Sequence, residues 1–128
     1  LLLDDSYNAS PESTLAALNL LAELPGRKVA VLGGMFELGE YEREGHEKVG
    51  IRAAQVADQL ITLGDLAKSI AFYANQAGMD ERLISSYSDP DQVVEILRTT
   101  LSKGDVVLIK GSHGLRMDHI VQALEVEE

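Results

Sequence analysis

The sequence contains no cysteine, which excludes both a disulfide framework and a thiolate metal site. It also lacks any run of about 18 apolar residues, the length that a transmembrane helix requires. No basic segment followed by an apolar stretch opens the chain, so no secretory signal is recognised. Together these absences favour a cytoplasmic protein without membrane insertion.

Basic residues are scarce as well: 11 Lys and Arg stand against 21 Asp and Glu, giving a formal net charge of −10. Such a surface repels duplex nucleic acid and anionic membranes unless its basic residues cluster, and here they are scattered. We therefore expect no nucleic-acid partner. If a polyanion such as ATP binds, groups outside this chain must neutralise most of its charge.

The composition is otherwise that of a globular protein, with 45% hydrophobic and 25% charged residues. The 128 residues suit one compact domain, 1–128, which is long enough to bury a core and which we expect to be monomeric. The first residue is Leu1 rather than Met, and Leu1–Leu3 leads directly into an acidic motif. We interpret the chain as a fragment of a longer protein.

Short apolar runs alternate with helical patterns along the whole chain. Helix starts are indicated by the capping residues Ser10, Asp65 and Asp89, of which the first and last precede a proline. Strands are predicted at residues 1–5, 28–32, 59–63, 83–87 and 105–110. Helices are predicted at about 11–23, 42–57, 66–77, 90–101 and 117–124.

This alternation predicts an α/β fold with parallel βαβ crossovers: a doubly wound, Rossmann-like, mostly parallel sheet of five to six strands with helices on both faces. The runs at 28–32 and 105–110 are nearly continuous apolar stretches, as strands buried on both faces should be. In such a sheet, ligands bind beyond the carboxyl ends of the strands. Four segments follow those ends: 4–11, 33–39, 64–65 and 110–114.

The first of these segments holds candidate nucleotide-binding residues. Asp5 offers a carboxylate to ribose hydroxyls, Tyr7 offers a ring that packs on a base or sugar, and Asn8 adds an amide. The alternative is structural: a strand end followed by a capped helix, whose polar groups only satisfy the backbone.

The second segment is rich in glycine but has neither the phosphate-loop spacing nor the dinucleotide-binding spacing. Its apolar residues Met35, Phe36 and Leu38 are expected to be exposed, and exposed apolar residues at a ligand edge contact a substrate or a neighbouring domain. A tight turn is the alternative. His46, four residues after Glu42, is expected to lean over the same edge.

The last segment combines Lys110 and Ser112 with small residues whose backbone N–H groups can form an anion-binding concavity. The alternative is a turn whose lysine pairs with a local carboxylate. The three histidines are scattered and lack metal-ligand spacing, so no metal site of the chain's own is expected.

Three motifs in this order resemble the C-terminal domain of the Mur ligases, in the branch that adds D-alanyl-D-alanine to the peptidoglycan precursor. They are DDSYNASPES at 4–13, AVLGGMFELGEYEREGH at 30–46 and VVLIKGSHGLRMDHIV at 106–121. The resemblance spans essentially the whole chain. The chain departs from the usual motifs at Ser10, where the family has Asn, and at Gly34, where it has Asp.

The resemblance implies a division of labour in a longer enzyme. An absent central domain would bind ATP and Mg²⁺ and activate the carboxylate of UDP-MurNAc-tripeptide as an acyl phosphate, and this domain would close over it. By the same resemblance, Asp5, Tyr7 and Asn8 approach ATP, whereas Met35, Phe36, Glu37, His46, Lys110 and Ser112 lie on the D-alanyl-D-alanine side. No catalytic base is implied, and the isolated domain is expected to be inactive.

Other classes of protein remain as alternatives. Sister Mur ligases and folylpolyglutamate synthases share this domain type, but their first motif usually has histidine where this chain has Ala9. A stand-alone flavodoxin-like or receiver-like module would use the pair Asp4 and Asp5, but its third-strand aspartate is displaced here to Asp65, after a glycine. A purely structural domain would not need polar glycine turns on one sheet edge.

Overall fold

A computed structural model of the chain describes residues 1–5, 9–111 and 115–127. Its strands are β1 (Leu2–Asp5), β2 (Lys28–Gly33), β3 (Gln59–Leu63), β4 (Ile84–Tyr87) and β5 (Val106–Lys110). Its α-helices are α1 (Pro11–Glu23), α2 (Glu42–Val56), α3 (Ala67–Gln76), α4 (Pro90–Thr100) and α5 (Met117–Glu127). Short 3₁₀ turns, η1 (Gly39–Tyr41) and η2 (Glu81–Leu83), precede α2 and β4.

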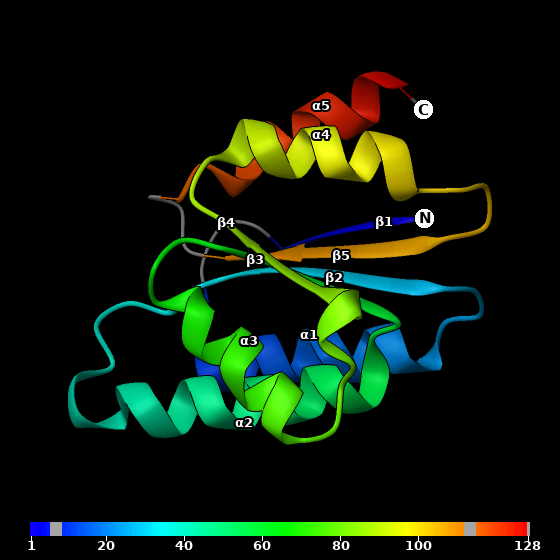
Figure 1. Cartoon of the computed structure of the whole chain (residues 1–128). Coiled ribbons are helices and arrows are strands. Elements are labelled where there is room, and N and C mark those ends of the chain that lie inside the picture. Colours follow the sequence, from blue (N-terminus) through cyan, green and yellow to red (C-terminus); the bar gives the residue numbers. More distant parts are fainter. Residues whose placement is uncertain (6–8, 112–114, 128) are drawn as a thin grey trace.

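The five described strands form one parallel sheet in the order β1-β5-β2-β3-β4. Helices α1, α2 and α3 cover one face, and α4 and α5 cover the other (Figure 1). The predicted doubly wound α/β fold is therefore confirmed. No helix in the described part of the chain is both long and apolar enough to cross a membrane.

Side chains of the central strands alternate between two hydrophobic cores. Along β2, Ala30 and Leu32 belong to the core under α1–α3, whereas Val29 and Val31 belong to the core under α4 and α5. All four are fully buried, because neighbouring residues of a strand point to opposite faces and both faces are covered. The continuous apolar run at 28–32 has this structural cause.

Two of the three predicted helix caps are present. Ser10 and Ser13 form a capping box before α1, and the Asp89 side chain accepts a hydrogen bond from the Asp91 N–H at the start of α4. The prediction that Asp65 caps α3 is wrong. The residue before α3, Leu66, already has helical dihedral angles and makes no side-chain cap, while Asp65 forms an ion pair with Lys68 at 3.2 Å.

The position of β5 determines where a crevice forms. β5 lies between β1 and β2, yet α5, which follows it, covers the opposite face from α1 and α2. Neighbouring strands whose following helices leave to opposite faces define a switch point, and ligands bind at the carboxyl ends of such strands. The fold therefore directs attention to the carboxyl end of β5 and its two neighbours.

Candidate functional site at the carboxyl edge

The strand register places the starts of three predicted segments side by side at the same edge of the sheet. Asp5 is paired with Lys110, and Lys110 is paired on its other side with Leu32. Gly33, next along β2, is paired with Leu63 of β3. The ends of four strands therefore lie at one edge, on the left in Figure 1, as the sequence predicts.

Several of the predicted site residues fall outside the described part of the chain. These residues are Tyr7 and Asn8 after β1 and Ser112 after β5. Asp5 itself is the last residue of β1, next to Lys110 at the sheet edge. The first and last predicted segments are thus adjacent where they leave the sheet.

The loop between β2 and η1 differs from its prediction at Met35. Met35 was expected to be exposed, but its side chain is 0% exposed and packs in the core beneath α1–α3, so that expectation is wrong. Its sulfur lies 3.9 Å from the Thr14 hydroxyl, which donates to it. The neighbouring Phe36 is 44% exposed, as predicted, and Leu38 is half-buried.

Glu37 lies in the same loop and is exposed, with a φ of 64°. A glutamate rarely adopts this left-handed conformation, because its Cβ crowds the backbone. Such strain persists only where surrounding structure imposes it, and it is often found at binding sites. The loop therefore presents Phe36 and Glu37 outward while Met35 anchors it inward.

His46 occupies a different place from the one predicted. Its side chain is 1% exposed, Nδ1 lies 2.7 Å from the Glu42 carbonyl oxygen, and Nε2 accepts a hydrogen bond from the Met35 N–H at 3.0 Å. Since Nε2 accepts, Nδ1 carries the proton and the ring is neutral. The expectation that His46 leans over the edge is wrong, because its ring points inward and holds the loop from behind.

Lys110 is the last residue of β5 and is only 2% exposed. The neighbouring Val106 and Leu108 belong to the core under α1–α3, so the two-residue alternation places Lys110 on the same face. A lysine this deeply buried requires polar partners for its ammonium group. Two roles were predicted for Lys110: pairing with a local carboxylate in the turn, and binding an anion. Either role would give the ammonium group a polar partner.

Leu115 is a residue at this edge that the sequence analysis did not identify. A methyl group added at Gly33 would lie 2.6 Å from Leu115 Cδ1, and one added at Gly64 would lie 3.1 Å from Leu115 Cδ2. Glycines at the ends of β2 and β3 thus make room for this side chain. The glycines that end these two strands in the sequence were the available signal for a bulky neighbour.

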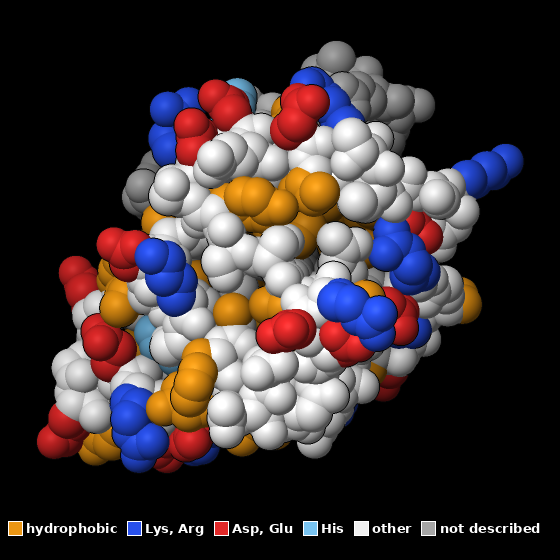
Figure 2. All heavy atoms as spheres, in the orientation of Figure 1, with side chains coloured by type: hydrophobic (Ala, Val, Ile, Leu, Met, Phe, Trp, Pro, Cys, Tyr) orange, Lys and Arg blue, Asp and Glu red, His pale blue; other side chains and the backbone are white. Residues whose placement is uncertain are grey.

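The start of α2 carries exposed ion pairs. Lys48 Nζ lies 2.9 Å from a Glu44 carboxylate oxygen, and Arg43 lies 3.9 Å from Glu47. The hydrogen bond from Lys48 lowers the pKa of the Glu44 carboxyl below its usual value. Figure 2 shows acidic and basic side chains side by side at the left of the view, where this helix begins. Among the described residues, no group of three His, Cys, Asp or Glu side chains is arranged to hold a metal ion.

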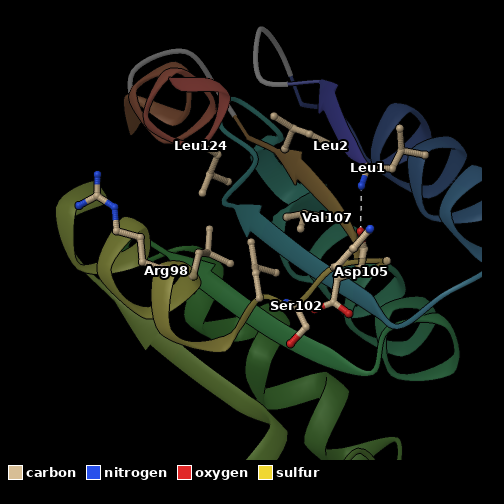
Figure 3. A pocket seen from close by; sticks show the side chains of 11 residues that line it. Leu1, Leu2, Arg98, Ser102, Asp105, Val107 and Leu124 are labelled. Carbon is tan, nitrogen blue, oxygen red and sulfur yellow. Dashed lines mark hydrogen bonds between the residues drawn. The ribbon is translucent and has the colours of Figure 1, made fainter. Parts of the chain in front are cut away.

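A hollow of about 530 Å³ opens at the opposite edge, near the amino ends of β1 and β5. Figure 3 shows Leu2, Val107 and Leu124 around it, and Arg98 on α4 beside it. Leucine is the most frequent residue in its lining, and none of the predicted site residues lies there. We therefore place the candidate site at the carboxyl edge, where the fold brings the polar segments together.

Comparison with known proteins identifies the family of the chain. Over residues 1–113 the chain matches the family described as Mur ligase, glutamate ligase domain. The chain belongs to this family.

Two curated relatives identify the branch more closely. The chain is 39% identical over 128 residues to the UDP-N-acetylmuramoyl-tripeptide–D-alanyl-D-alanine ligase of Synechocystis, and 35% identical over 126 residues to the enzyme of that name from Bacillus subtilis. These matches cover 98% and 96% of this chain but only 28% and 27% of the relatives. The chain thus spans little more than a quarter of their length. The comparisons favour this branch over the sister ligases, folylpolyglutamate synthases and stand-alone modules considered above.

Solved structures show the same relationship. The crystal structure of MurF ligase from Thermotoga maritima in complex with ADP matches with a TM-score of 0.81 and 35% identity, over 98% of this chain and 28% of that one. A MurF structure from Acinetobacter baumannii matches with a TM-score of 0.79 and 25% identity, over 96% and 27%. The parallel sheet and its helices are therefore those of a Mur ligase domain.

Proposed function

We propose that the chain is the C-terminal domain of a cytoplasmic, monomeric, ATP-dependent ligase that joins D-alanyl-D-alanine to UDP-MurNAc-tripeptide. The observation that carries this proposal is the match of nearly the whole chain to ligases of that name. The alignment of the polar segments at one sheet edge supports it, because that edge is where this class of fold binds ligands.

In the proposed reaction, ATP transfers its γ-phosphoryl group to the tripeptide carboxylate, giving an acyl phosphate and ADP. The amine of D-alanyl-D-alanine then attacks the acyl carbon, and an amide forms as phosphate leaves and the amine loses a proton. Phosphoryl transfer depends on cations around the phosphates. The net charge of −10 supports the proposal that a central domain outside this chain binds most of the ATP phosphates and Mg²⁺.

This domain would supply two sides of the closed site. The nucleotide side would consist of Asp5, Tyr7 and Asn8. The Thermotoga maritima relative was solved in complex with ADP, which supports a nucleotide site in the whole enzyme. Phe36, Glu37, Lys110 and Ser112 form the dipeptide side, where apolar surface, a cation and a hydroxyl suit two methyl groups and a carboxylate. Met35 and His46 support the dipeptide side from the interior.

Steady-state kinetics of Asp5→Ala in the full-length ligase tests this assignment. We expect the KM for ATP to rise roughly ten- to a hundredfold, because a lost charge-assisted hydrogen bond costs about 1.5–3 kcal/mol. The KM for D-alanyl-D-alanine should change much less. Asp4→Ala is the matched control, since it removes the adjacent carboxylate of the same strand. An unchanged KM for ATP in a folded Asp5→Ala enzyme would leave Asp5 with only a structural part in helix entry.

A further inference from the structure

In the loop after β2, one buried backbone N–H donates its hydrogen bond to a side chain. Met35 is buried, and its N–H donates to Nε2 of His46 rather than to a neighbouring strand or helix. A buried N–H without a partner is costly, so this hydrogen bond constrains the loop conformation. The loop therefore depends on one ring nitrogen for its position over the sheet.

The imidazole ring is itself fixed. Its Nδ1 lies 2.7 Å from the carbonyl oxygen of Glu42, one helical turn earlier, and the ring is 1% exposed. With both nitrogens engaged by the main chain, the ring links the first turn of α2 to the loop. It has no ring nitrogen left to offer a substrate.

Neighbouring contacts make the loop and the start of α1 one unit. Thr14 donates to the Met35 sulfur, and a methyl group at Gly45 would lie 2.9 Å from Pro11 Cγ and 3.0 Å from Leu38 Cδ1. Gly45 thus allows α2 to approach both the loop and α1 closely. Glu37, whose φ is 64°, lies between Met35 and Leu38, which both take part in this packing.

We infer that His46 is a positioning residue for the incoming dipeptide, which fixes the loop so that Phe36 and Glu37 meet D-alanyl-D-alanine in one conformation. This inference rests on the proposed function. It assigns His46 an effect on substrate recognition through the Met35 N–H, and no contact with the substrate itself.

Two substitutions test the hydrogen bonds of the two ring nitrogens separately. His46→Gln places an amide oxygen near the position of Nε2 and keeps an acceptor for the Met35 N–H. His46→Asn reaches only as far as Nδ1, keeps a donor for the Glu42 carbonyl and leaves the Met35 N–H without its acceptor. In the full-length ligase we expect His46→Asn to raise the KM for D-alanyl-D-alanine about tenfold, which is about 1.4 kcal/mol, with the KM for ATP unchanged. We expect His46→Gln to stay within about threefold of the wild type.

A purely structural histidine would behave differently. Both variants would then lower the melting temperature and leave the dipeptide KM unchanged, which would overturn the inference, as would equal rises of that KM in both variants. If the wild-type ligase made no amide from D-alanyl-D-alanine at all, the proposed function would fail instead, so the two failures are distinguishable.

A second pair of variants decides the matter if His46→Asn does not fold. Glu37→Asn tolerates a positive φ, whereas Glu37→Val resists it, and both remove the carboxylate. If loop conformation governs recognition, the dipeptide KM of Glu37→Val should exceed that of Glu37→Asn about tenfold. Equal values in the two folded variants would overturn the inference.

Discussion

Glycines at the carboxyl ends of the strands act here as packing positions. A methyl group on Gly33 would meet Leu115 at 2.6 Å, and one on Gly111 would meet Met117 Cγ at 2.8 Å. The segment 115–117 therefore lies directly on the ends of β2 and β5. Close packing of this kind leaves little tolerance for an added side chain, because interiors are as dense as organic crystals.

Gly34 shows how local packing relates to a departure from the family motif, which usually has Asp at this position. A Cβ on residue 34 would lie 2.5 Å from Leu66 Cβ and 3.2 Å from the Ala67 nitrogen. We expect Gly34→Ala to lower the free energy of unfolding by about 1–3 kcal/mol, because backbone must move to admit the methyl group.

Urea denaturation of the 128-residue chain measures this change. Gly39→Asn is the matched control: nothing lies within 4 Å of its Cβ position, and asparagine accepts the φ of 59°. Its effect should stay within about 1 kcal/mol. A Gly34→Ala chain as stable as the wild type would mean that Leu66 moves aside freely.

Lys110 and Ser112 belong to the proposed dipeptide side, and Lys110 is buried at the end of β5. We expect Lys110→Met or Ser112→Ala, in the full-length ligase, to raise the KM for D-alanyl-D-alanine about tenfold at constant stability, or about 1.4 kcal/mol. Steady-state kinetics beside thermal melting makes the distinction. A KM within about twofold, with a lowered melting temperature, would show that the turn is structural.

At the scale of residues, the position of each segment at the sheet edge was predictable, but the burial of Met35 and His46 was not. Residues that follow strands could be assigned to one edge, because parallel strands end together. The inward orientation of Met35 and His46 depends on how α1 and α2 pack against the loop. Sequence spacing carries no information on that packing. Met35 was therefore predicted to be exposed, and His46 was predicted to lean over the sheet edge.

Among the elements, Arg27 connects the amino ends of the sheet. Its guanidinium donates to the Asp105 carboxylate at 2.8 Å, to the Thr100 carbonyl at 2.8 Å and to Gln59 at 3.1 Å. One side chain thus joins the starts of β2, β3 and β5 with the end of α4. Asp105 also accepts from the Ser102 N–H at 2.8 Å, which fixes the turn before β5.

This arrangement predicts a dependence of stability on pH. The hydrogen bonds from Arg27, then that from the Ser102 N–H, lower the pKa of Asp105 below its ordinary value. A carboxyl with a lowered folded pKa stabilises above its unfolded pKa, about 3.9, and loses that contribution as pH falls through the folded pKa. Asp105→Asn should therefore cost about 1 kcal/mol at pH 7, a modest figure because Arg27 is 38% exposed, and less near pH 3.

Urea denaturation of both chains at pH 7 and near pH 3 measures this dependence. Asp80→Asn is the control, since Asp80 is more exposed and pairs with Arg82 only two residues away, at 2.7 Å. Its cost should be much smaller than that of Asp105→Asn at either pH, because solvent screens an exposed ion pair. A cost of Asp105→Asn that stays constant with pH would assign the effect to the neutral hydrogen bonds alone.

The elements themselves were largely predictable, because each follows from a local pattern. Apolar runs and helical periodicity placed all ten described α-helices and strands to within a few residues, and Ser10 and Asp89 identified two helix starts. Asp65 does not cap α3 with its side chain, because the main chain closes the turn before the helix: the Lys68 N–H donates to the Asp65 carbonyl at 3.1 Å. The order of strands, with β5 between β1 and β2, depends on long-range crossovers that no local pattern encodes.

At the scale of the molecule, the chain is acidic and corresponds to a small part of the length of its relatives. It covers 28% of the Synechocystis ligase and carries a net charge of −10. We expect the isolated chain to fold, since it has two buried cores, but to release no phosphate from ATP in the presence of UDP-MurNAc-tripeptide and D-alanyl-D-alanine. A phosphate-release assay with the full-length ligase as positive control tests this. Turnover by the isolated chain would contradict the proposed division of labour.

The position of β5 in the sheet also determines when, during synthesis, the carboxyl edge can form. β1 pairs with β5 alone, and three strands and four α-helices separate the two along the chain. On the ribosome, β1 therefore emerges long before the strand that it pairs with, and such distant pairings form slowly. A nascent chain released before Val106 would lack the strand that places Asp5 beside Lys110. Translation must pass β5 before this edge of the domain can form.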